Sequence, residues 1–251
     1  YTIDAEVFAM TSEAIRSLRA SEPDIHFRVL VLESNAKWPE MGWAYDDATQ
    51  VHIPGIPFNF NQYNNIGLEM TSSEWVVFTN NDVVFHPNWC NTMLASHAEN
   101  PALRCLCPVD PDSEYTPPGT FPAEASYQVG YLVRVTFTGW CFMVQRSVFS
   151  ETGKFDERFD YYFADDDFSM SMRREVILNA AIPASKVTHL AHITSKKADL
   201  NISEKFRSAR QTYHAKWGSQ RLIAWKSRLV DYLLHPLGMK GIIRKIYRPK
   251  P

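Results

Sequence analysis

The chain has 251 residues, of which 45% are hydrophobic, 13% aromatic and 22% charged, with a formal net charge of −2. This composition can build one sizeable hydrophobic core, alone or with a small appendage. The balanced charge argues against a disordered protein and against one that coats nucleic acid. The chain has neither a long uncharged apolar run typical of a transmembrane helix nor a signal segment at its start.

Alternating periodicities along the chain predict alternating helices and strands. Apolar residues at helical spacing predict helices over 5–20, 61–73, 146–153, the part of 155–174 after its carboxylates, and 204–217. Short β-branched and apolar runs predict buried strands over 27–32 and 75–79, a strand pair over 133–144 and a last strand or loop over 187–192. The Pro- and Gly-rich stretch 108–130 predicts a loop. This order is typical of an α/β fold with a mostly parallel central sheet flanked by helices.

The cysteines and the C-terminal tail lead to two further predictions. The four cysteines form no CxxC pair, which favours reduced, buried thiols of a cytoplasmic protein over a zinc site. From Arg221 onward the sequence has eight Lys or Arg residues and one acidic residue, Asp231, with apolar residues between them. This pattern predicts a basic amphipathic helical extension over 219–251, after a domain over 1–218. Such a helix can contact an anionic membrane surface through 221–251 or pack on its own domain.

The first polar cluster, Asn80-Asn81-Asp82, directly follows the predicted strand 75–79. Ligands of open α/β sheets bind at the carboxyl ends of strands. A carboxylate there can reach Mg²⁺ or Mn²⁺ bridging the phosphates of a nucleotide diphosphate. The same residues are also ordinary turn formers.

The second cluster is Asp165-Asp166-Asp167. Three adjacent carboxylates repel one another, and a nearby cation or proton relieves that repulsion. One of them could accept a proton from an attacking hydroxyl, although acids also favour the first turn of a helix without any catalytic role. His189, at a later strand end, is a candidate third metal ligand.

Taken together and in order, several segments resemble the family 2 glycosyltransferases, which have the GT-A fold. The resemblance spans about residues 5 to 218 and rests on the following segments: Asn65-Ile66-Gly67, Asn80-Asn81-Asp82, TGWCFMVQRSVF at 138–149, GKFDERF at 153–159, the acidic cluster, His189 and Lys216-Trp217-Gly218. The NND sequence resembles the form of the metal-binding motif found in rhamnosyltransferase-like members. Tyr1-Thr2 resembles the remnant of the first strand, so we expect part of the nucleotide pocket upstream of Tyr1.

The resemblance implies a role for each matching residue on the donor side. It implies that Asp82 binds the metal and the diphosphate, that His189 completes the Mn²⁺ or Mg²⁺ site, and that Trp140 borders the acceptor. The implied donor-binding residues are Glu33, Asn65, Asn80, Asn81, Asp82 and Gly139, with Glu33 standing where the family has an Asp that contacts the nucleotide base.

On the catalytic side, the resemblance implies that Asp167 is the general base when Arg173 sets the alignment. Asp166 then lies toward the acceptor, and Asp165 is the rival base because a one-residue shift is easy in such a run. The family function would be inverting transfer of a sugar from a dTDP-rhamnose or UDP-sugar donor to a glycan or lipid-linked acceptor, in the cytoplasm or on the inner face of the membrane.

Two other classes of protein remain open. A nucleotidyltransferase or nuclease usually has a glycine-rich phosphate loop or a basic groove, and residues 1–218 contain neither. A non-catalytic sugar- or nucleotide-binding scaffold of the GT-A type is the second alternative. We expect a hexosyltransferase that binds no nucleic acid.

Overall fold

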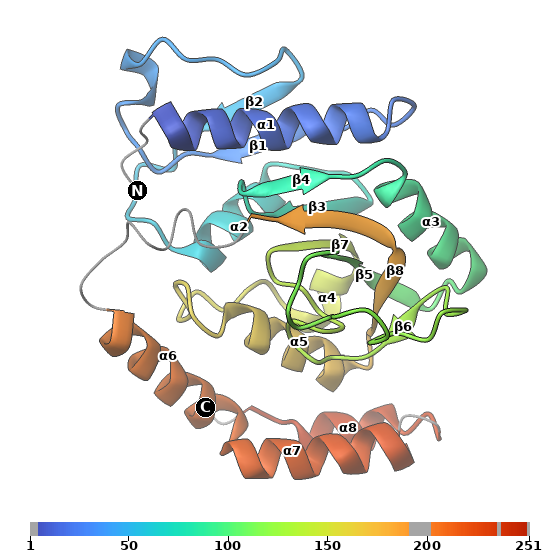
Figure 1. Ribbon diagram of the computed structural model, residues 1–251. Coiled ribbons are helices and arrows are strands. Elements are labelled where there is room, and N and C mark those ends of the chain that lie inside the picture. Colours follow the sequence, from blue (N-terminus) through green and yellow to red (C-terminus); the bar gives the residue numbers. More distant parts are fainter. Residues whose placement is uncertain (1–4, 191–201, 235–236, 250–251) are drawn as a thin grey trace.

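Two β-sheets with helices on both sides make up the domain, as Figure 1 shows for this computed structural model. The structure describes residues 5–190, 202–234 and 237–249. The strands are β1 (Val29–Leu32), β2 (Thr49–His52), β3 (Trp75–Thr79), β4 (Val83–Phe85), β5 (Leu103–Val109), β6 (Gln128–Val129), β7 (Cys141–Gln145) and β8 (Leu178–His189). The helices are α1 (Ala5–Ser21), a 3₁₀ turn (Trp38–Glu40), α2 (Phe60–Glu69), α3 (Trp89–Glu99), α4 (Val148–Thr152), α5 (Ala164–Glu175), α6 (Ile202–Trp217), α7 (Gln220–Leu229), a π turn (Val230–Leu234) and α8 (Lys240–Ile246).

The larger sheet has the strand order β3-β7-β5-β8-β4, with β6 paired to β8. Strands β3, β5 and β8 run in the same direction, because β3 and β5 are both antiparallel to β7 and β5 is parallel to β8. Strands β4 and β6 pair antiparallel with β8. In the second sheet, β1 and β2 are parallel. The predicted α/β architecture, with sheet strands flanked by helices, is confirmed.

Three apolar clusters hold these layers together. One cluster, centred on Trp89 and Met93, packs α1 and α3 on one face of the larger sheet. A second, centred on Phe142 and Phe168, packs α4 and α5 on the other face. The third joins α5 to the C-terminal helices, where Val230 is fully buried. The burial of these large side chains supplies most of the favourable free energy of folding, at roughly 1.5–3 kcal/mol each.

Several predicted elements match the structure, whereas α3 and β5 were not predicted and α5 begins before its three carboxylates rather than after them. The helix predicted over 5–20 is α1, the strand predicted over 75–79 is β3, and Gly153 ends α4 with a positive φ of 79°. The strand pair predicted over 133–144 is wrong in its first half. Only β7 is a strand there, and Val133 makes an isolated bridge to Phe137 in a tight loop. The remnant strand predicted at Tyr1-Thr2 lies outside the described residues.

All four cysteines are buried and free, as predicted. The C-terminal helices pack on the domain, since Ile243 and Tyr247 of the α8 segment are buried against the underside of α5. In the described part of the chain, no helix is long and apolar enough to cross a membrane. The predicted domain boundary after residue 218 falls between α6 and α7 and stays a prediction.

Candidate active site

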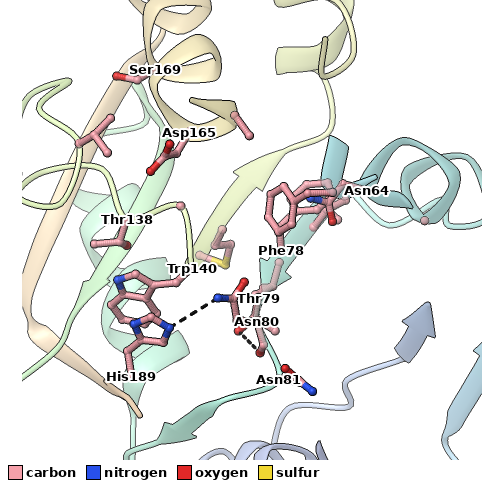
Figure 2. A pocket seen from close by; sticks show the side chains of 18 of the residues that line it. Asn64, Phe78, Thr79, Asn80, Asn81, Thr138, Trp140, Asp165, Ser169 and His189 are labelled. Carbon is pink, nitrogen blue, oxygen red and sulfur yellow. Dashed lines mark hydrogen bonds between the residues drawn. The ribbon is translucent and has the colours of Figure 1, made fainter. Parts of the chain in front are cut away.

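One large cavity, of about 1680 Å³, opens where the strand ends, the start of α5 and the helices α6 and α7 meet. Its lining includes both acidic regions singled out in the sequence, although more than 80 residues separate them along the chain. The predicted site residues that line it are Glu33, Asn80, Asn81, Asp82, Gly139, Trp140, Asp165, Asp166 and His189. Figure 2 shows Asp165 above Trp140, with His189 stacked on Trp140 and joined to the neighbouring Asn80.

The Asn80-Asn81-Asp82 turn is placed by its two flanking strands. Strand β3 ends at Thr79, and β4 begins at Val83 to pair with the far end of β8. Asn80 N–H donates to the carbonyl oxygen of Trp140 (2.7 Å), which ties the turn to the segment before β7. The Asn81 amide donates to Thr11 Oγ1 of α1 (2.9 Å), so its side chain points toward the β1–β2 layer.

Asp82 and His189 meet because their strands are neighbours. Val83 stands opposite His189 in the β4–β8 ladder, and Asp82 Oδ1 lies 3.3 Å from His189 Nε2. Asp82 is only 3% exposed, so water does not solvate its carboxylate freely. The His189 ring stacks on Trp140 with centroids 5.0 Å apart and planes 5° from parallel, and Asn80 Nδ2 lies 3.5 Å from His189 Nε2. The imidazole is therefore held at the turn from two sides.

These groups fit a divalent cation that is shared with a diphosphate. Asp82 Oδ1 is buried and accepts no hydrogen bond within the described structure, and His189 Nε2 lies 3.3 Å from it. Burying a carboxylate oxygen without a hydrogen bond is costly. Carboxylate and imidazole are suitable ligands for Mn²⁺, and carboxylate for Mg²⁺. Among the described residues no group of three or more His, Cys, Asp or Glu side chains gathers as a metal site. A cation at Asp82 and His189 would therefore need further ligands, such as the oxygens of a diphosphate.

The first turn of α5 carries Asp165 and Asp166 into the cavity. Their backbone lies at the positive end of the helix dipole, which favours carboxylates there. Asp165 packs against the chain at Gly139, where a Cβ atom would come within 2.5 Å of the Asp165 Cβ. A glycine at 139 is therefore required for this close approach, whether or not it contacts a ligand.

The two carboxylates in the cavity share a raised proton affinity. Burial and the adjacent Asp165 carboxylate together raise the pKa of Asp166 to about 7, against the opposing charge of Arg134. Burial likewise raises the pKa of Asp165, which the backbone N–H of Asp166 and the charge of Arg134 oppose. Such a pair can take up and release a proton near neutral pH, as a general base must.

Asp167, predicted as the general base, is absent from the cavity lining. It is 3% exposed, and Trp217 Nε1 donates to its Oδ1 (2.7 Å) while Lys216 Nζ lies 2.8 Å from the same oxygen and 2.9 Å from Oδ2. Lys216 also binds Asp156 at 2.8 Å. Both oxygens of Asp167 are therefore committed to α6, and the geometry favours Asp165 or Asp166 as the base.

The Lys216 ion pairs yield a stability prediction. Lys216→Met should lower the free energy of unfolding at pH 7–8 by about 3 kcal/mol, because it leaves the buried Asp167 carboxylate without its cation, whereas Asp156 keeps its ion pair with Arg158. Lys216 lowers the pKa of Asp167 against the raising effect of burial. Without Lys216 that pKa rises further, so the destabilisation should shrink as the pH falls and the carboxylate takes up a proton. Urea unfolding at pH 5 and pH 8 measures both effects, and an equal loss at the two pH values would contradict this account.

Two predicted donor-binding residues have other partners. Asn65 is buried in α2, where its amide donates to Phe155 O and to Glu157 Oε1 and its carbonyl accepts from Phe155 N–H, each at 2.9–3.0 Å. Asn65 does not line the cavity, so its contacts are structural and explain the NxG segment without a ligand. Glu33 lines the cavity after β1, but its Oε1 accepts from Asn35 N–H (2.6 Å) within the loop. Burial raises the pKa of Glu33.

The sequence did not single out two residues that line the cavity. Asn64 faces it from α2, one position before Asn65, and its buried Nδ2 makes no hydrogen bond within the described structure. Asn64 faces the cavity and Asn65 does not, because neighbouring residues of a helix point about 100° apart. Arg134 is held by Tyr115, whose hydroxyl accepts from Nη1 (3.0 Å), and its guanidinium faces the ring at 4.9 Å. Its left-handed backbone (φ 71°) is unusual for arginine and gave no signal in the sequence.

Comparison with known sequences agrees with the resemblance seen in the motifs. No protein-family model matches the chain. The chain is 23% identical over 221 residues to the O-antigen biosynthesis protein RfbC of Myxococcus xanthus, covering 74% of this chain and 16% of that protein. It is 26% identical over 168 residues to an N-acetylglucosaminyl-diphospho-decaprenol L-rhamnosyltransferase of Mycobacterium tuberculosis, covering 54% of this chain and 53% of that protein. The chain thus corresponds to only part of either relative.

Comparison with solved structures supports the fold. A structure of GalNAc-T7 with UDP, GalNAc and Mn²⁺ superposes with a TM-score of 0.61 at 11% identity, over 93% of this chain and 51% of that chain. Residues 1–349 of TarS from S. aureus superpose with a TM-score of 0.56 at 14% identity, over 96% of this chain and 78% of that chain. The chain therefore has the GT-A fold of glycosyltransferases, and it resembles the rhamnosyltransferase-like members of family 2, as its motifs predict.

Proposed function

We propose that the chain transfers a sugar, with inversion, from a dTDP- or UDP-linked donor to a hydroxyl of a glycan or lipid-linked acceptor. One observation carries this proposal. The Asn80-Asn81-Asp82 turn and the Asp165–Asp166 pair line a single cavity, which is large enough for both substrates. One region supplies ligands suited to a metal-bound diphosphate, and the other supplies a carboxylate suited to deprotonate a hydroxyl.

On the donor side, Asp82 and His189 would hold Mn²⁺ or Mg²⁺ together with the diphosphate. The ion, when bound, neutralises charge that grows on the departing phosphate. Mn²⁺ accompanies UDP in the GalNAc-T7 structure, which supports a divalent ion in this fold. The side chains of Asn80 and Asn64 would bind the ribose or the phosphates from either side. Trp140, stacked on His189, would offer an apolar face to the sugar ring.

On the acceptor side, we propose Asp165 as the general base. Its carboxylate would take the proton of the acceptor hydroxyl as that oxygen bonds to the anomeric carbon and the sugar–phosphate bond breaks. The nucleoside diphosphate leaves with the bonding electron pair. Asp166, on the same helical turn, would share the proton and contact the acceptor. Asp165 is preferred because it packs directly beside the Gly139–Trp140 segment that borders the metal-binding turn.

The nature of the acceptor is inferred from the relatives. The mycobacterial relative is named for a sugar acceptor carried on a diphospho-lipid, and the Myxococcus relative for O-antigen synthesis. We propose rhamnose from dTDP-rhamnose as the first donor to test, with a lipid-linked or growing cell-surface glycan as the acceptor. In this proposal the reaction takes place on the cytoplasmic side of a membrane, which residues 221–251 would contact.

A donor panel with Mn²⁺ tests the proposed function. The purified chain is incubated with dTDP-rhamnose and with several UDP-sugars, with and without a GlcNAc-diphosphoryl-lipid analogue. Release of dTDP or UDP and the mass of the glycosylated lipid are measured. We expect one donor to give acceptor-dependent release. Thermal stabilisation by a nucleotide without any transfer would favour a binding scaffold instead, and release of pyrophosphate would favour a nucleotidyltransferase.

The raised pKa values predict how transfer depends on pH. The base must be ionised to act, and burial raises the pKa of Asp165, so the transfer rate should rise at a pH above the ordinary pKa of an aspartate. The neighbouring Asp166, whose pKa burial and Asp165 raise to about 7, should titrate together with it. The charge of Arg134 lowers the pKa of both carboxylates, so Arg134→Gln should move the rise to higher pH. Lys154→Gln, an exposed substitution outside the cavity, serves as the control. A profile that Arg134→Gln leaves in place would contradict the electrostatic role of Arg134.

A further inference from the structure

Helix α7 is amphipathic in an unusual way, with apolar residues on two opposite sides. Its inner side lines the active-site cavity through Gln220, Ile223, Ala224 and Ser227. At about 100° per residue, these positions form one side of the helix. The helix is anchored by Val230, which follows its last turn and is fully buried in the C-terminal cluster. One side of α7 is therefore part of the wall of the substrate cavity.

The outer side of α7 carries Leu222, Trp225 and Leu229, spaced three and four residues apart. At about 100° per residue, they point roughly opposite to the inner side. Leu222 is 40% exposed and Trp225 is 61% exposed, although burying a tryptophan is strongly favourable. Leu229, the last of the three, is half-buried, so Leu222 and Trp225 form the exposed part of the outer side.

The exposed apolar surface continues beyond α7. Leu233, Leu237 and Ile242, in and between the π turn and α8, are 56%, 70% and 42% exposed. Figure 1 places α7 and α8 side by side below α5, on the opposite side of the molecule from β1 and β2. An apolar patch of this kind on a protein surface usually serves as a contact site.

Basic residues surround these apolar side chains. Arg221 and Arg228 are exposed on α7 next to Trp225 on the helical wheel, and Lys245 and Arg248 are exposed in the α8 segment. From residue 219 to the end of the chain the sequence has eight Lys or Arg residues and one acid. Tryptophan beside arginine and leucine is the composition of helices that lie in the interface of an anionic bilayer.

We propose that the outer side of α7, together with the exposed residues that follow it, binds the surface of an anionic lipid membrane. In this position α7 lies between the bilayer and the cavity, with one side against each. An α-helix is about 10–12 Å across. An acceptor anchored in the bilayer would thus meet the edge of the cavity at about one helix diameter from the bilayer surface.

The positive charge of this surface favours an anionic lipid membrane as its partner over another protein or a second copy of this chain. The excess of basic residues repels an identical surface, whereas it attracts anionic lipid headgroups. Helix α7 has ten residues, so it can lie on a bilayer but is too short to span one. The membrane contact rests on this surface alone and does not require the proposed sugar transfer.

Vesicle sedimentation tests the proposal on the full chain. We expect binding to vesicles of phosphatidylglycerol and phosphatidylcholine and at least about tenfold weaker binding to phosphatidylcholine alone. The variant Leu222→Ala/Trp225→Ala should weaken binding to the anionic vesicles by about tenfold or more. Its control, Ile56→Ala/Met70→Ala, removes two apolar side chains of similar exposure from elsewhere on the surface and should bind as the wild type does.

A second pair of variants tests how much charge contributes to vesicle binding. Arg221→Gln/Arg228→Gln should weaken binding to anionic vesicles by about tenfold, whereas Arg16→Gln/Lys154→Gln removes two exposed charges elsewhere and should have little effect. Equal binding by the variants and their controls, or no difference between the two vesicle types, would overturn the proposal. A concentration-dependent dimer that Leu222→Ala/Trp225→Ala abolishes would overturn it in favour of self-association. Circular dichroism and donor hydrolysis confirm that each variant is folded, and neither readout depends on membrane binding.

Discussion

Replacing Asp165 with asparagine is expected to lower kcat for sugar transfer by about 10²- to 10⁴-fold, the usual contribution of a positioned general base. Asparagine keeps the size of the side chain beside Gly139 but cannot take up the proton of the acceptor hydroxyl. Donor binding should change little, because the base acts on the acceptor. Steady-state rates measured with saturating donor and acceptor, together with calorimetric titration of the nucleotide, separate the two effects.

Asp167→Asn is the matched control for this variant. It removes a charge from the same helical turn, but the asparagine Oδ1 can still accept from Trp217 and Lys216 of α6, and only the contact of Lys216 with Oδ2 is lost. We expect it to retain transfer within about tenfold of the wild type once the folded fraction is taken into account. Loss of transfer in Asp167→Asn with near-normal rates in Asp165→Asn would reverse the assignment and restore the base expected from the Arg173 alignment.

The sequence located the acidic site but could not choose among its three carboxylates. Adjacent residues on a helix point about 100° apart, so Asp165 and Asp167 lie on nearly opposite sides of α5. Which side faces the cavity depends on α6, whose Lys216 and Trp217 bind Asp167 from 49 and 50 residues away. The KWG segment was noticed as a motif, but nothing in the sequence revealed that two of its side chains hold the acidic cluster.

Strands whose own residues show a clear pattern were predicted, whereas a strand that depends on distant partners was predicted only in part. The run WVVFT is apolar and β-branched over its whole length, so β3 was predicted with its observed ends. Strand β8 was predicted only at its end, because it spans Leu178–His189 and pairs with three different partners along its length. Its polar residue Asn179 is fully buried, and its amide donates to the carbonyl oxygens of Gly130 and Thr136. The sequence of β8 can therefore be recognised as a buried strand only when the strands that pair with it are known.

Asp82→Ala should reduce kcat/KM by about 10³-fold or more. Lewis-acid assistance to a leaving diphosphate is worth several kcal/mol, and each 1.36 kcal/mol changes the rate about tenfold. Excess EDTA should abolish transfer by the wild type, and added Mn²⁺ should restore it. Asp112→Ala removes an exposed carboxylate from the 108–130 loop and should have no effect.

A buried aspartate can also support folding, so Asp82→Asn is needed beside the alanine variant. It keeps the shape of a side chain whose Oδ1 accepts no hydrogen bond within the described structure, and the fold should therefore tolerate it. If Asp82 serves the cation, the asparagine variant melts near the wild-type temperature yet binds Mn²⁺ at least about tenfold more weakly in a calorimetric titration. Wild-type turnover in excess EDTA would exclude a catalytic cation at Asp82 and His189. The burial of Asp82 Oδ1 beside His189 would then need another explanation, such as a direct hydrogen bond from the donor sugar.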